Sequence, residues 1–185
     1  EPAEMLRILN GLSQLVDIAD EAGRRDLGIL QLQAVEKLEP RRDQLTPPQS
    51  QRLDQCRAQA YVATGRIDDA VELYATLRTA SPKDRDLQTN QAQVLVTCGS
   101  RRCLKQGRKL WQELEASYKS GSKQWLNARY YRALCAYELD DFDVCHKLLG
   151  IAAQLYPDLG SPELQAQYQE LQEKCAARRK ENGTQ

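Results

Sequence analysis

The chain has 185 residues, of which 41% are hydrophobic and 28% are charged, values that are ordinary for a soluble protein of about one domain. Basic and acidic residues number 26 each, so the formal net charge is zero, which argues against a globally basic nucleic-acid binder. No apolar run approaches the roughly 18 residues that a membrane-spanning helix needs, so membrane insertion is not expected.

The first twenty residues carry acids and lack the basic start and apolar centre of a signal peptide. Because the chain begins at Glu1 instead of Met, we expect a processed form or a piece of a larger protein. The location stays open. Buried thiols would fit a reducing, cytoplasmic setting, whereas an exported protein or a larger processed protein would fit the missing start.

Apolar residues recur at spacings of three and four, and Gly and Pro separate stretches of helical length. The pattern predicts an all-α fold in which each Gly-containing turn joins two antiparallel helices. The clearest turn is at Gly65, and Pro82 follows the second helix of that hairpin. We expect hairpins over residues 9–42, 51–84, 85–121 and 126–159, and then a single helix over residues 161–180.

The turn positions recur at a fixed distance. Gly99 lies 34 residues after Gly65, and Pro157 lies 75 residues after Pro82, which is two such periods and seven inserted residues. Gly23 lies 42 residues before Gly65, and the excess of eight matches an insertion at residues 43–50. Gly23 is therefore expected in the first turn. The alternative is an irregular helical bundle with accidental periods.

Within this period, small, aromatic and proline positions also recur. The second hairpin has Ala58, Tyr61, Ala70, Tyr74 and Pro82, and the fourth has Ala133, Cys145, Leu149 and Pro157. The pattern resembles the tetratricopeptide repeat (TPR) family. The resemblance implies one domain over residues 1–185, a right-handed superhelix of stacked hairpins with a terminal capping helix, because a single hairpin cannot bury its own apolar face. Gly28 and Gly107 stand at small positions in the other hairpins.

The resemblance also implies that the first helix of each hairpin lines a concave groove, which binds a peptide or a helix of a protein partner. The expected groove residues are Asn10, Ser13, Asp17 and Asp20 in the first hairpin, Arg52, Gln55, Gln59 and Val62 in the second, Asp86, Thr89, Gln93 and Val96 in the third, and Asn127, Tyr130, Leu134 and Tyr137 in the fourth.

The fourth hairpin supplies the aromatic end of this groove. We expect a neutral or weakly basic peptide whose apolar anchor binds near Tyr130, Leu134 and Tyr137. The alternative is that Leu134 and Tyr137 only pack against the terminal helix. A second alternative is a structural scaffold that self-associates as a homodimer, with Trp125, Tyr130 and Tyr131 as the apolar contact.

One subgroup of the family clamps the C-terminal carboxylate of chaperones with Lys, Asn and Arg side chains at groove positions. Asn90 could be the Asn of such a clamp, but Gln55, Gln59, Asn127 and Tyr131 stand where its cations are expected. Binding of a chaperone tail is therefore not expected.

Catalytic and metal chemistry is not expected either. The only histidine, His146, follows Cys145, so the two side chains project in different directions from a helix. The acid pairs at residues 68–69 and 140–141 fit helix starts, where acids favour the positive end of the helix dipole. No C-x-x-C pair is present, so we interpret the six cysteines mainly as apolar fillers, with no zinc site and no cofactor.

Two features leave alternatives open. The segment 101–109, "RRCLKQGRK", holds five cations, of which Arg101, Lys105, Arg108 and Lys109 can share one helical side. It is either a solvated helix face or a docking patch for an anion or a nucleic acid. The spacing of Cys98 and Cys103 permits a small disulfide loop, with reduced thiols as the default expectation.

Overall fold

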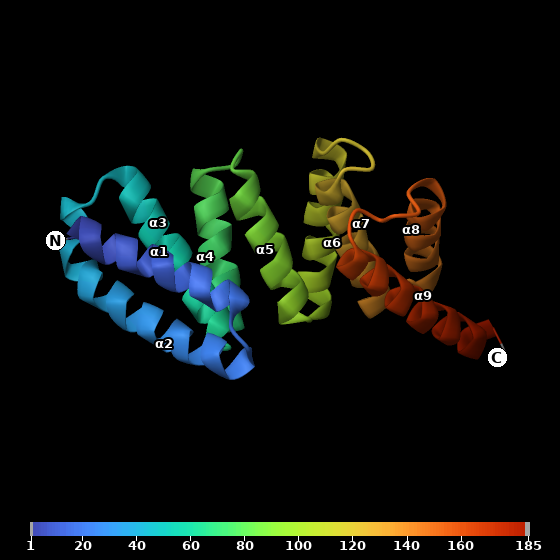
Figure 1. Ribbon diagram of the computed structural model, residues 1–185, viewed down its shortest axis with the longest axis horizontal. Helices are drawn as coiled ribbons and strands as arrows, with labels where there is room; N and C mark the ends of the chain where they lie inside the picture. Colours follow the sequence, from blue (N-terminus) through green and yellow to red (C-terminus); the bar gives the residue numbers. More distant parts are fainter. Residues whose placement is uncertain (1, 184–185) are drawn as a thin grey trace. The chain divides into compact units, whose positions relative to one another are not determined.

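The structure is a computed structural model that describes the backbone of residues 2–183 and, within that range, all side chains except those of residues 2, 3, 17, 182 and 183. The described part consists of helices joined by turns and contains no strand (Figure 1), which confirms the all-α prediction. The helices are α1 (Pro2–Ile18), α2 (Glu21–Leu38), a short 3-10 helix (Glu39–Gln44), α3 (Pro47–Ala63), α4 (Ile67–Ala80), α5 (Arg85–Cys98), α6 (Arg101–Ser117), α7 (Lys123–Glu138), α8 (Phe142–Leu155) and α9 (Pro162–Gly183).

The chain divides into two compact units, Glu1–Leu87 and Gln88–Gln185. The division falls near the start of α5, so the first unit holds α1 to α4 and the second holds the rest of α5 with α6 to α9. The expected single domain over residues 1–185 stays a prediction.

In the first unit, each helix packs against the next, and α1 also packs against α3. The core between α1, α2 and α3 contains Leu9, Leu38, Leu53 and Cys56, all fully buried. The close approach of α2 to α3 depends on Gly28, because a methyl group there would lie 2.7 Å from the Cβ of Ala63. Gly28 therefore has the small-residue role that the repeat pattern predicts.

In the second unit, α6 packs against α7, α7 against α8 and α8 against α9, and α7 also packs against α9. Trp111 of α6 is buried and stacks on Tyr131 of α7, with 4.7 Å between the ring centroids. The apolar side of α9 contributes Leu164, Tyr168 and Leu171 to the core. The terminal helix thus covers the apolar sides of α7 and α8, as a capping helix does.

The turn between α3 and α4 and the turn between α7 and α8 have the same backbone conformation, 75 residues apart. Gly65 has φ +77° and Asp140 has φ +65°, a left-handed conformation that Gly and Asp adopt more easily than other residues. The following residues match as well, because Arg66 has φ −82° and ψ 62°, and Asp141 has φ −88° and ψ 63°. Both backbone N–H groups donate to the carbonyl five residues earlier, at 2.8 Å.

The ends of these two hairpins match too. Ser81, which follows α4, has φ −133° and ψ 69°, and Tyr156, which follows α8, has φ −135° and ψ 75°. Buried positions recur with the same spacing in the pairs Ala58 and Ala133, Ala70 and Cys145, and Tyr74 and Leu149. The sequence repeat in these two hairpins is thus also a structural repeat.

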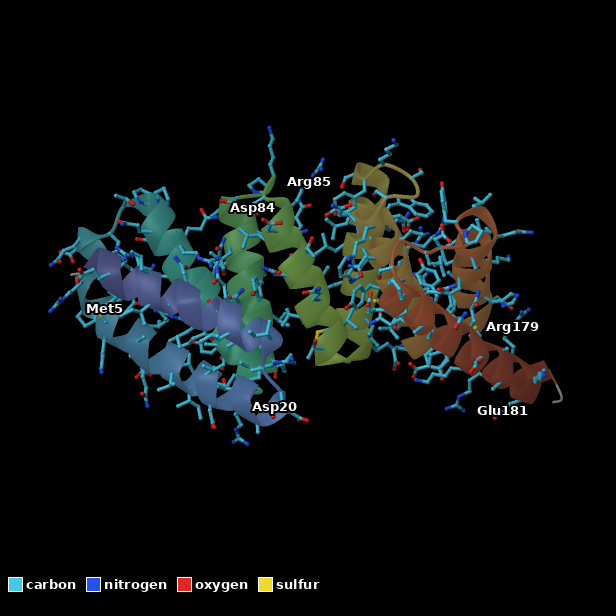
Figure 2. All side chains as sticks on the ribbon, viewed as in Figure 1. Met5, Asp20, Asp84, Arg85, Arg179 and Glu181 are labelled. Carbon is cyan, nitrogen blue, oxygen red and sulfur yellow. A yellow bond between two sulfur atoms is a disulfide. The ribbon has the colours of Figure 1, made fainter. Side chains whose placement is uncertain are left out.

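The first hairpin departs from the expected positions. The turn between α1 and α2 lies at residues 19–20, and Gly23 belongs to the first turn of α2. Asp20 starts that helix (Figure 2), since its Oδ1 accepts a hydrogen bond from the Gly23 N–H at 2.9 Å, as an N-cap residue does. The hairpin also begins earlier than residue 9, because α1 starts at Pro2.

Candidate partner-binding site

Three residues expected in the groove, one from the first hairpin and two from the second, come together on α1 and α3. Arg52 and Gln55 are half-buried on α3, and Asn10 is half-buried on α1. The Arg52 Nε donates to Asn10 Oδ1 at 2.6 Å, and its Nη1 donates to Gln55 Oε1 at 3.0 Å. Side chains that are more than 40 residues apart in the sequence therefore form one hydrogen-bonded row, which we call the α1–α3 row.

Gln59 extends this row along α3, one turn after Gln55. It is half-buried, and its Oε1 is shielded from solvent but has no hydrogen-bond partner among the described residues. A buried acceptor without a partner costs about 1–3 kcal/mol. Because the oxygen is shielded, a peptide N–H group would reach it only after the Gln59 side chain rotates outward.

Two other residues expected in the groove have structural roles instead. Ser13 is buried between helices, where its Oγ accepts a hydrogen bond from Gln31 Nε2 at 2.9 Å and donates to Cys56 Sγ at 3.6 Å. The prediction for Ser13 is wrong, because the serine faces the core and a partner cannot reach it. Asp20 is the N-cap of α2, and the side chain of Asp17 lies outside the described residues.

The expected groove residues of the third hairpin lie on α5, on both sides of the unit boundary. Asp86 is exposed and belongs to the first unit. Its backbone N–H donates to Asp84 Oδ1 at 3.0 Å, at the start of α5 (Figure 2). In the second unit, Gln93 is exposed, and Thr89 and Val96 are half-buried. Their role in binding stays a prediction.

The aromatic end of the expected groove packs against other parts of the second unit. Asn127 is half-buried, and Tyr130, Leu134 and Tyr137 pack against the core that includes α9. The Tyr130 ring lies 5.7 Å from the ring of Tyr168, and burial raises the pKa of Tyr130. Packing against the terminal helix therefore accounts for the contacts of these side chains, and an anchoring role for them stays a prediction.

A buried charge cluster lies between α6 and α7, and the sequence pattern does not predict it. Glu115 is only 7% exposed, and its carboxylate lies 3.4 Å from Arg129 Nε and 3.1 Å from Arg132 Nη1. The Arg129 guanidinium also lies over the Trp125 ring, 4.5 Å from its centroid. One signal could have indicated the burial of Glu115, because it follows Trp111 by four residues and so shares the apolar side of that helix.

The basic segment of α6 borders a depression on the second unit. The depression has a volume of about 350 Å³ and is lined by Arg101, Lys105, Arg108, Leu139 and Asp141. Three of the four cations expected on one side of α6 thus gather at one place, and Lys109 does not line it.

The cysteines are divided between a disulfide and the core. Cys98 and Cys103 are joined across the turn between α5 and α6, contrary to the default expectation of reduced thiols. The remaining four, Cys56, Cys135, Cys145 and Cys175, are buried, which confirms their interpretation as core fillers. Burial raises the pKa of the Cys135 thiol to about 12.

Three of the four paired acids lie at helix starts, as the sequence predicts. Asp68 and Asp69 are in the first turn of α4, and Asp69 accepts a hydrogen bond from Arg66 Nε at 2.6 Å. Asp141 is the residue directly before α8, whereas Asp140 lies in the turn itself, with φ +65°. Asp69 and Asp141 both pair with arginines.

Within residues 2–183, no helix is long and apolar enough to cross a membrane, and no group of three His, Cys, Asp or Glu side chains is arranged to hold a metal ion. A comparison with protein-family models finds no match, and neither does a comparison with curated proteins.

Proposed function

We propose that the chain is a protein-interaction module of the tetratricopeptide type, which binds a peptide or a helix of a partner along α1 and α3. One observation carries the proposal. Asn10 of the first hairpin and Arg52 and Gln55 of the second, all expected in the groove, form the α1–α3 row, and Gln59 follows one turn later with an acceptor oxygen that has no partner among the described residues.

The arrangement of the helices supports this proposal. In the first unit, α1 packs against α3, so the first helices of two consecutive hairpins are neighbours. In the second unit, α7 is the first helix of its hairpin and packs against the terminal helix α9. The hairpins α3–α4 and α7–α8 repeat the same turn conformation after 75 residues. Repetition of one hairpin conformation along the chain favours a solenoid, in this proposal a right-handed superhelix, over an irregular bundle.

The chemistry of the α1–α3 row indicates the kind of ligand. The row consists of half-buried amide side chains and one arginine that Asn10 and Gln55 already hold. Amide groups can donate to and accept from a peptide backbone without selecting for charge. The row therefore suits an uncharged or weakly charged peptide segment, held mainly through its backbone.

The test begins with peptides selected from a random displayed library on the immobilised protein. Their affinity is then measured for the wild type and for Gln55→Ala/Gln59→Ala. We expect at least about tenfold weaker binding, which corresponds to about 1.4 kcal/mol. The matched control is Gln33→Ala/Gln112→Ala, two exposed glutamines on α2 and α6. The proposal would be contradicted if Gln55→Ala/Gln59→Ala bound the peptides as tightly as the wild type. It would also be contradicted if the control variant lost as much affinity as Gln55→Ala/Gln59→Ala.

Self-association is a second candidate function, and a different surface favours it. Trp125, expected in such a contact, is buried in the second unit, and Tyr131 stacks on Trp111. Large apolar side chains are instead exposed on α1, where Ile8, Leu15 and Ile18 are 61%, 48% and 81% exposed. Their spacing of seven and three residues places them on one side of the helix.

Sedimentation of the wild type and of Ile8→Gln/Ile18→Gln tests this candidate. A dimer that dissociates in the variant would support self-association. A wild-type monomer at every concentration would rule it out and leave the peptide-binding proposal.

A further inference from the structure

The depression beside α6 is built by two segments of the second unit. Arg101, Lys105 and Arg108 come from successive turns of α6, at spacings of four and three residues, and so share one side of the helix. Leu139 and Asp141 come from the turn between α7 and α8. We call this place the α6 depression.

The charges of the α6 depression do not balance. Arg108 Nη1 lies 2.8 Å from Asp141 Oδ2, so these two charges compensate each other. Arg101 and Lys105 are exposed and have no ion-pair partner within the described part of the chain. The depression therefore has two uncompensated positive charges, in a chain whose formal net charge is zero.

The elements around the depression are held in place. The Oγ of Ser100 accepts a hydrogen bond from the Cys103 N–H at 3.2 Å, which starts α6, and the Cys98–Cys103 disulfide closes the turn before it. On the other side, the Asp141 N–H donates to the Ala136 carbonyl at 2.8 Å. Because backbone positions on both sides are fixed, a ligand would not have to order them, which favours binding.

We propose that the α6 depression docks a segment of a partner protein that carries two adjacent negative charges. One phosphorylated side chain supplies about −1.5 to −2 at neutral pH, and two neighbouring carboxylates supply the same. Either group matches the two free cations, and the planar guanidinium of Arg101 can donate two parallel hydrogen bonds to a phosphate or a carboxylate. A volume of about 350 Å³ holds one or two side chains.

The same features disfavour a nucleic acid as the ligand. Single strands bind to grooves where aromatic side chains stack on successive bases, whereas the described residues that line the depression include no aromatic side chain. The depression belongs to the second unit and the α1–α3 row to the first, so this inference is independent of the proposed peptide-binding function.

The test uses four fluorescent probes with the full chain. Three are peptides that share a Gly-Ser background and carry at their centre a phosphoserine, a Glu-Glu pair or a neutral Ser-Ser pair. The fourth is a single-stranded oligothymidine. Anisotropy gives the affinity of each probe, and the arginine Nε–Hε resonances in NMR spectra show which side chains it contacts. We expect the phosphoserine or the Glu-Glu peptide, or both, to bind and to shift Arg101, and the neutral peptide to bind at least about tenfold more weakly.

Two charge-reversed variants locate the site. Arg101→Glu/Lys105→Glu changes the two free cations of the depression, and Arg102→Glu/Lys109→Glu makes the same change in charge on the same helix outside it. Both pairs are exposed, so both variants should retain the circular dichroism spectrum of the wild type. We expect the first variant to lose at least about tenfold in affinity for the acidic probe and the second less than about threefold.

Three results would overturn the proposal. Equal losses in the two variants would show a diffuse effect of charge without a site. Equal affinities for acidic and neutral peptides would exclude recognition of charge. Tighter binding of the oligothymidine than of either acidic peptide at the same salt concentration, lost in Arg101→Glu/Lys105→Glu, would show a nucleic-acid surface.

Discussion

Substitution of Gly28 by alanine tests the close packing of α2 on α3. The new Cβ would lie 2.7 Å from the Cβ of Ala63 and 3.2 Å from the Cγ2 of Thr64. Carbon atoms prefer a separation of about 3.5–4.0 Å, so the first contact is about 1 Å too short. The Ala63 methyl is attached directly to the backbone and cannot rotate away, so the two helices must move apart.

The magnitude follows from two opposing effects. Overpacking of this kind costs about 1–3 kcal/mol, and alanine is better than glycine in a helix interior by about 1 kcal/mol. With a contact this short we expect Gly28→Ala to lower the free energy of unfolding by about 1–2 kcal/mol. Gly11→Ala in α1 is the matched control, because a Cβ there meets nothing within 4 Å, and it should raise that energy by about 1 kcal/mol.

The assay is urea unfolding followed by far-ultraviolet circular dichroism, with hydrogen exchange of α2 and α3 to show that the change lies in the first unit. The difference between the two variants isolates the packing term, since both have the same change in helix propensity. If Gly28→Ala is as stable as Gly11→Ala, the described approach of α2 to α3 is incorrect.

Four further predictions concern the second unit. Glu115→Gln should destabilise the fold by about 3 kcal/mol in urea, because it leaves two largely buried arginines without their carboxylate, whereas the exposed Glu113→Gln should change little. Tyr168→Phe removes a buried hydrogen bond of 2.8 Å to a helix carbonyl and should cost about 1 kcal/mol in the same assay. Because the pKa of Cys135 rises from 9.0 to about 12, the fold retains a proton that the unfolded chain releases. The free energy of unfolding should therefore fall as the pH rises through this range, and Cys135→Ala should make urea midpoints less dependent on pH. A thiol titration of the denatured, unreduced protein should find four thiols, and six would exclude the disulfide.

Much of the helix arrangement could be predicted because its signals are local. A glycine in a left-handed turn and a proline after a helix are read directly from neighbouring residues. Gly65 indicates one turn in this way, and Pro157, 75 residues after Pro82, indicates the hairpin whose turn lies at Asp140. The first turn was misplaced because Gly23 follows the capping residue Asp20 by three positions. Glycine and an N-cap aspartate both indicate a helix boundary, and here α2 begins directly after Asp20, with Gly23 inside the helix.

The candidate site could be predicted only in part, because side-chain partners depend on how helices meet. The pattern put Asn10, Arg52 and Gln55 on one groove, and the structure joins them. The same pattern wrongly placed Ser13 in the groove. Ser13 follows Asn10 by three residues on α1, and helical spacing alone does not separate a surface position from a neighbouring core position. The pairing of Glu115 with arginines on α7 depends on the register of two packed helices, which no local pattern specifies.

The proposal that a peptide binds along α1 and α3 is tested most directly by locating the bound peptide. The side-chain amide resonances of Gln55 and Gln59 can be followed by NMR during titration with a selected peptide, beside those of Gln33 and Gln112. The α1–α3 row predicts shifts at Gln55 and Gln59, with the two control glutamines unchanged. Saturated binding that leaves Gln55 and Gln59 unshifted would contradict the claim.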